Sequence, residues 1–157
     1  MEELLELRQL LEAGKMSEAM LLLDEMDELA KDDKINKIES HLVILLLHLI
    51  KQQAENRTTR SWNLSISNST RGVVKSWRRR KTGGYYLTSD ELIETISEAF
   101  PEALRRAALE AFDGKYTERQ LTPFIDIERV KGEACRRLFA PEKADDDTDT
   151  DIPQWLK

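Results

Sequence analysis

A nearly unbroken apolar run near residue 45 limits what this chain can fold into. Residues 42–50 read LVILLLHLI, and Ile35, Ile38, Leu42, Leu45 and Leu49 recur at alternating spacings of three and four. That spacing predicts a helix over about residues 33–55 with a heptad-like seam. Because most neighbouring positions are apolar too, we expect this helix to be the central rod of an all-α helical bundle, packed by several other helices.

Start and stop signals place further helices on both sides of this rod. Two leucine-rich segments flank Gly14, and the second runs from Ser17 to about residue 30, which predicts an N-terminal helical hairpin. Asp32 or Asp33 is expected to cap the central helix as a separate element. Residues 58–81 show a four-turn helical stripe, which we favour over a shorter strand-like alternation, and therefore predict a basic fourth helix antiparallel to the rod.

Shorter helices are predicted for the C-terminal half. Thr88 and Thr117 each begin a capping-box pattern, with Glu91 and Gln120 three residues later. We expect Phe100-Pro101 to separate one helix from the next, and a last helix to span about residues 126–139. Residues 1–140 are assigned to a single all-helical domain, and residues 141–157 to a flexible acidic tail that is too polar to bury.

The charges are divided unevenly along the chain. The net charge of -6 combines a middle segment, residues 51–81, with nine basic residues and one acid, and two flanks with a net charge of -7 each. A basic island between acidic flanks fits attraction within the molecule or an anionic partner. The single cysteine, Cys135, excludes an internal disulfide and suits a cytoplasmic protein. The apolar run is far shorter than the roughly 20 residues that cross a membrane.

A polar signature is set into the end of the central helix and the segment after it. Its pattern is a leucine-rich helix with His and Lys, then an Arg, a Ser-Trp pair, an Ile and a later Arg. It is made up of Ser40, His41, Leu45, Leu46, His48, Leu49, Lys51, Gln52, Arg57, Ser61, Trp62, Ile66 and Arg71. In this pattern the chain resembles the bacterial domain-of-unknown-function family DUF29. The resemblance implies an all-helical fold and no particular activity.

Several residues of this signature are candidates for a polar site. We expect His48 to be a hydrogen-bonded core residue, with Ser61 or a backbone carbonyl as its partner. The cations could bind an anion beside a stacking ring, or could pair with Glu25, Asp27 and Glu28 of the hairpin, which we favour. The candidate site residues are His48, Lys51, Arg57, Ser61, Trp62 and Arg71.

The basic segment 71–81 is the best candidate for binding nucleic acid. Clustered cations would contact phosphates, and neighbouring aromatic rings would stack on bases, whereas compensation of a helix dipole explains only two or three of the charges. The candidate contacts are Lys75, Trp77, Arg78, Arg79, Arg80 and Lys81.

The sequence offers no recognisable reaction centre. His41 and His48 are about 10 Å apart along a helix, which is too far to share a metal ion, and no other metal or cofactor motif is present. We therefore expect a non-enzymatic protein that binds a protein partner or itself, as an interaction or scaffold module. The alternative is a nucleic-acid-binding protein that uses residues 71–81.

Overall fold

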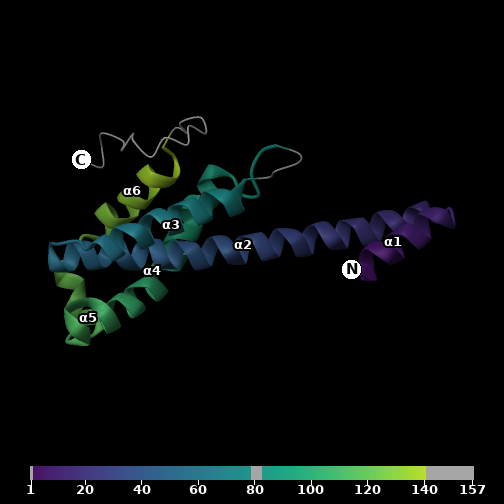
Figure 1. The fold of residues 1–157 in the computed structure, drawn as a ribbon. Helices are drawn as coiled ribbons and strands as arrows, with labels where there is room; N and C mark the ends of the chain where they lie inside the picture. Colours follow the sequence, from purple (N-terminus) through teal and green to yellow (C-terminus); the bar gives the residue numbers. More distant parts are fainter. Residues whose placement is uncertain (1, 79–82, 141–157) are drawn as a thin grey trace.

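The structure, a computed structural model, describes residues 2–78 and 83–140. Within these ranges the chain forms six α-helices and no strand, so the all-α prediction is confirmed. One long helix, α2 (Met16–Glu55), runs through the whole molecule, and four of the other described helices pack along it (Figure 1). The segment 141–157, predicted to be a flexible tail, lies outside the described residues.

The first helix, α1 (Glu2–Glu12), folds back along the beginning of α2, as the predicted hairpin requires. Gly14 adopts a φ of 72° between the two helices, a conformation that glycine reaches without strain. The predicted boundary at Asp32 or Asp33 is wrong, because α2 continues through both residues. No Gly or Pro interrupts this stretch, an interior Asp costs less than about 1 kcal/mol, and Asp33 forms an ion pair with Lys37 one turn later at 3.4 Å.

The basic fourth helix is confirmed as α3 (Arg60–Trp77), which runs antiparallel to α2. Asn56 ends α2 in the left-handed conformation, which asparagine tolerates better than most residues. Thr59 then caps α3, its hydroxyl oxygen accepting a hydrogen bond from the backbone N–H of Trp62 at 3.1 Å. A loop of four residues, 56–59, therefore reverses the chain and places the two helices side by side.

The next helix, α4 (Ser89–Glu110), begins at the predicted capping box of Thr88 and Glu91. The predicted separation at Pro101 is wrong, because α4 passes through this residue. An interior proline costs about 3 kcal/mol. The buried side chains of Ile96 and Phe100, which precede the proline by five residues and one residue, offset the cost, since each large apolar side chain contributes about 1.5–3 kcal/mol on burial.

The chain then closes with short elements. A tight turn at Ala111–Gly114 ends α4, and the predicted capping box of Thr117 and Gln120 opens the short α5 (Glu118–Leu121). A further turn, Thr122–Phe124, leads to α6 (Ile127–Leu138), which Asp126 caps through the backbone N–H of Arg129. This helix packs against α2, α3 and α4.

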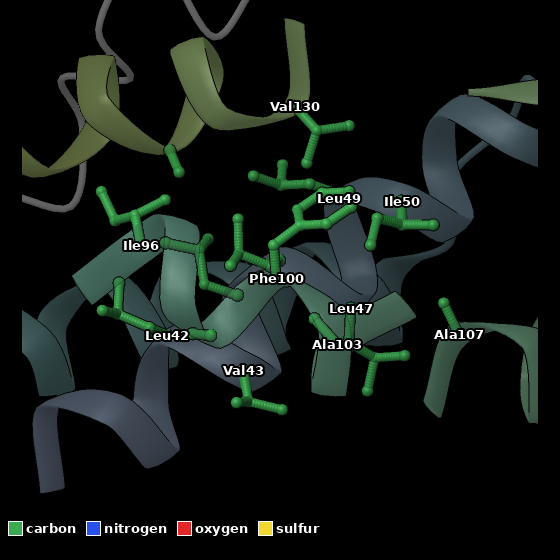
Figure 2. Packing of buried hydrophobic residues seen from close by; sticks show 14 of the residues in the cluster. Leu42, Val43, Leu47, Leu49, Ile50, Ile96, Phe100, Ala103, Ala107 and Val130 are labelled. Atoms are coloured by element: carbon green, nitrogen blue, oxygen red, sulfur yellow. The ribbon is translucent and has the colours of Figure 1, made fainter. Parts of the chain in front are cut away.

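The core lies around the second half of α2. Leu42, Leu45, Leu46 and Ile50 are completely buried, and Figure 2 shows side chains of α4 and α6, such as Phe100 and Val130, converging on this region. The heptad-like seam is therefore buried against helices of the same chain. None of the helices in the described ranges is both long and apolar enough to pass through a membrane.

The N-terminal part of the molecule has a different character. Residues 2–30, which we call the hairpin arm, project beyond the bundle as two helices, with no third helix of the described ranges beside them (Figure 1). No residue of α1 is buried, and Ala19 is the one buried position of the described arm. Exposed large apolar side chains on the arm are Leu4, Leu5, Leu11, Met16, Met20, Leu21, Leu23 and Leu29.

Candidate functional site

Part of the polar signature meets where α2, α3 and α4 come together. Lys51 is buried on α2, and its Nζ lies 3.3 Å from Oε1 of Glu110 at the end of α4. The same Nζ lies 4.6 Å from the centre of the Trp62 ring. A buried lysine is tolerated only with such partners, so one carboxylate and one aromatic face account for this charge.

Arg57 covers the same tryptophan from the loop between α2 and α3. Its guanidinium carbon lies 4.6 Å from the centre of the Trp62 ring, and Nη2 lies 3.1 Å from Oε1 of Glu55. Trp62 is only 9% exposed. Two cations therefore contact one buried indole, and each already has a carboxylate partner. Neither acid belongs to the hairpin arm that we expected to supply the partners.

His48 lies one turn before Lys51 on α2. Its Nδ1 is buried and has no hydrogen-bond partner among the described residues, and Ser61, the expected partner, is exposed on α3. Burial and the neighbouring charge of Lys51 lower the pKa of His48 below its usual value, against a smaller opposing effect of Glu110. The imidazole is therefore held neutral, and the expected hydrogen bond to Ser61 is not formed.

Glu110 is the member of this cluster that the sequence did not reveal. It is 59 residues away from Lys51 in the chain, and no local pattern connects the two. Gln52, which belongs to the polar signature, makes contacts closer in the chain: its Nε2 donates hydrogen bonds to Thr58 at 2.7 Å and to Asn63 at 3.1 Å. These bonds fix the α2–α3 turn.

The basic residues of α3 itself lie on the side of the helix that faces away from this cluster. Trp62, Ile66 and Val73 face the core, and the opposite side of the helix carries Arg60, Leu64, Arg71 and Lys75, all exposed. These four residues recur at spacings of four and seven, so they form one line along the helix. We call this line the basic face. In the part of the chain that the structure describes, no carboxylate pairs with Arg60, Arg71 or Lys75.

The basic segment at the end of α3 is only partly described, because Arg79, Arg80 and Lys81 lie outside the described residues. Lys75 is exposed and Arg78 is half-buried. Trp77 is buried: its Nε1 donates a hydrogen bond to the carbonyl of Leu87 at 2.8 Å, and its ring stacks on Tyr85 with 4.1 Å between ring centres. A base that stacked on Trp77 would first have to displace Tyr85.

One pocket on the described surface is lined by residues other than His48, Lys51 and Trp62. This pocket of about 370 Å³ between the end of α2 and α6 is lined by polar residues that include Gln52, Gln53, Asn56 and Arg129. The described ranges contain no group of three His, Cys, Asp or Glu side chains that could hold a metal ion.

The comparison with protein families decides the relationship of this chain. A family model described as domain of unknown function DUF29 matches residues 4–123. The chain belongs to the DUF29 family. No curated protein and no solved structure matches it. The DUF29 match includes the hairpin arm from residue 4 onward, the whole cluster around Lys51 and the basic face, and it ends before α6.

Proposed function

We propose that this DUF29 protein is a non-enzymatic interaction module whose hairpin arm is the binding surface. The observation that carries the proposal is the arm itself, a pair of amphipathic helices that leaves eight large apolar side chains exposed. So many large apolar side chains exposed on one short element of a protein are typical of a surface that binds a partner. We expect the module to act in the cytoplasm.

The cluster around Lys51 supports a structural role for the polar signature. Lys51 pairs with Glu110, Arg57 pairs with Glu55, and both cations lie against the ring of Trp62. Side chains in these contacts hold α2, α3 and α4 together, and using them on a substrate would break the ion pairs. We therefore infer that the arm binds the partner and that the cluster around Lys51 stabilises the fold.

The experiment compares protein capture by variants of the immobilised full chain. Replacing Met16, Met20 and Leu23 by Gln should abolish the capture of proteins from a cell extract, because an interface loses most of its affinity when its central apolar anchors are lost. A matched control replaces Ile93 and Leu109, which are equally exposed on α4, and should capture the same proteins as the unaltered chain. Equal capture by the arm variant would overturn the proposal.

Nucleic-acid binding is a second candidate, favoured by the basic face. Arg60, Arg71 and Lys75 lie in one line without carboxylate partners in the described structure, as a helix that tracks a phosphate backbone requires. Replacing Arg78, Arg79 and Arg80 by Ala, or the three cations of the basic face by Gln, should weaken retention on heparin and on single-stranded RNA and DNA. Each lost phosphate contact should also lower the salt dependence by about one unit of slope. Unchanged retention would remove this candidate.

A further inference from the structure

The hairpin arm has a chemically distinct outer side. In the part of α2 that belongs to the arm, the side chains withdrawn from solvent are those of Ala19, Leu22 and Met26. Their spacing places them on one face of the helix, which is turned toward α1. The opposite side of α2 carries exposed Met20, Asp24 and Glu28, with exposed Met16 and Asp27 at its edge. Apolar side chains on this outer side are thus interspersed with acids, and residues 2–30 together carry nine acids and two basic residues, a net charge of -7.

The basic face of α3 is complementary to this surface. It combines Arg60, Arg71 and Lys75 with Leu64, an apolar side chain that is 60% exposed. The two surfaces also match in length, since α2 from Met16 to Ala30 spans about 22 Å and the 18 residues of α3 span about 27 Å at 1.5 Å per residue.

The two surfaces cannot meet within one molecule. Gly72 of α3 lies against His41 of α2, so Lys75, one turn further, is level with about Ile38. The acids of the arm begin at Glu28, about 15 Å farther along α2. Because α1 folds back only along the arm (Figure 1), it does not bring its own acids to α3. The arm and the basic face of α3 lie at different levels along α2, so a second molecule is needed to bring an arm next to a basic face.

We propose that the arm of one molecule docks on the basic face of α3 in a second copy of this chain, reciprocally, so that two antiparallel copies form a closed dimer. This inference rests on the proposed function of the arm and names its partner. The arm is an extension of the α2 rod, and α3 lies beside the other half of the same rod (Figure 1). Turning a second molecule end to end therefore brings each arm alongside the other molecule's α3, as a two-fold axis requires.

Charge decides between this arrangement and a four-helix bundle made of two arms. Pairing arm with arm would bring together two groups of charge -7, and like charges at an interface oppose association. Pairing arm with basic face instead brings acids next to the cations of α3 twice in each dimer. Each contact is a single pair of helices about 22 Å long that depends on exposed charges, so we expect dissociation in the micromolar range and strong salt dependence.

The test is a charge exchange on the full chain, measured by analytical ultracentrifugation from low micromolar to submillimolar concentration. The unaltered chain should form a dimer that dissociates in 1 M salt. Replacing Arg60, Arg71 and Lys75 by Glu should give a monomer, and so should replacing Asp24, Asp27 and Glu28 by Lys. An equimolar mixture of the two variants should form a dimer again, because both contacts then join opposite charges. All six positions are exposed, and circular dichroism checks that each variant stays helical.

The outcomes separate this inference from the function proposed for the arm. A monomer at every concentration, or a dimer that survives the exchange on α3, would overturn docking on the basic face. Loss of the dimer only when Met16, Met20 and Leu23 are made polar would leave the arm as a binding surface and place its partner elsewhere. If a charge-reversed variant does not fold, the milder change of Arg60, Arg71 and Lys75 to Gln replaces it and should weaken dimerisation at least tenfold.

Discussion

The imidazole ring of His41 occupies the space beside Gly72 that a side chain would fill. A Cβ atom built on Gly72 would lie 2.6 Å from the nearest atoms of that ring, closer than carbon atoms pack. The missing side chain therefore allows α3 to approach α2 at this level. Gly72 is in the middle of a helix, where glycine costs about 1 kcal/mol relative to alanine, and the close approach explains its presence.

Replacing Gly72 by Ala should destabilise the protein by about 1 kcal/mol. Overpacking against the His41 ring costs about 1–3 kcal/mol, which outweighs the gain of about 1 kcal/mol in helix propensity. Urea denaturation followed by circular dichroism measures the change.

A control and a double variant complete this test. A Cβ atom on Gly132 of α6 would have no described atom within 4 Å, so Gly132→Ala should stabilise the protein by about 0.5–1 kcal/mol. Combining Gly72→Ala with His41→Ala should remove the clash and recover most of the lost stability. A double variant as unstable as the sum of its parts would show that the ring is not the obstacle.

Glu110 and Lys51 should respond unequally to substitution. Glu110→Gln leaves the buried charge of Lys51 without its carboxylate and should cost about 1–2 kcal/mol, a value moderated by the 47% exposure of the glutamate side chain. Lys51→Met removes the buried charge and keeps the packing against Trp62, so it should be close to neutral. Thermal denaturation of both variants measures the change in stability. A larger loss of stability for Lys51→Met than for Glu110→Gln would contradict this prediction.

The elements that the sequence predicted well are those with local signals. The capping boxes at Thr88 and Thr117 and the turn at Gly14 depend on residues within a few positions of each other, and the structure has all three. The two wrong boundaries, at Asp32–Asp33 and at Pro101, depended on residues that often mark helix ends. At Pro101, burial of side chains on α4 kept the helix continuous, and that information is not local. At Asp32–Asp33, no helix-breaking residue accompanies the acids, so a residue type that often caps helices was read as a boundary where the helix continues.

The candidate site was predictable only in part, for the same reason. A short turn joins α2 to α3 and brings together four residues that are close in the sequence: His48, Lys51, Arg57 and Trp62. Their proximity could therefore be predicted. Glu110 joins them through the packing of α4, which no spacing in the sequence reveals. Gly72 offered an unused signal, since an interior helical glycine usually marks a close contact.

The stability of the protein should depend on His48 between neutral and mildly acidic pH. The folded state lowers the pKa of His48 below the ordinary 6.5, so the unfolded chain binds more protons as the pH falls below that value. Stability is therefore present above pH 6.5 and is lost as the pH falls toward the folded pKa. Urea denaturation at pH 7 and pH 5.5 should show this loss in the unaltered chain and a smaller one in His48→Leu. Equal losses in both would assign the effect to other groups.

The hairpin arm should open independently of the bundle in the monomer. Local opening costs little where few apolar side chains are buried, and in the described arm only Ala19 is buried, whereas residues 42–50 of the same helix are almost all buried. Amide hydrogens of residues 18–30 should therefore exchange orders of magnitude faster than those of residues 42–50, although both segments belong to one continuous helix. Hydrogen–deuterium exchange with mass spectrometry, on the charge-reversed α3 variant so that dimerisation does not interfere, measures both segments at once. Equal protection along α2 would mean that the arm unfolds together with the core and is part of one cooperative unit.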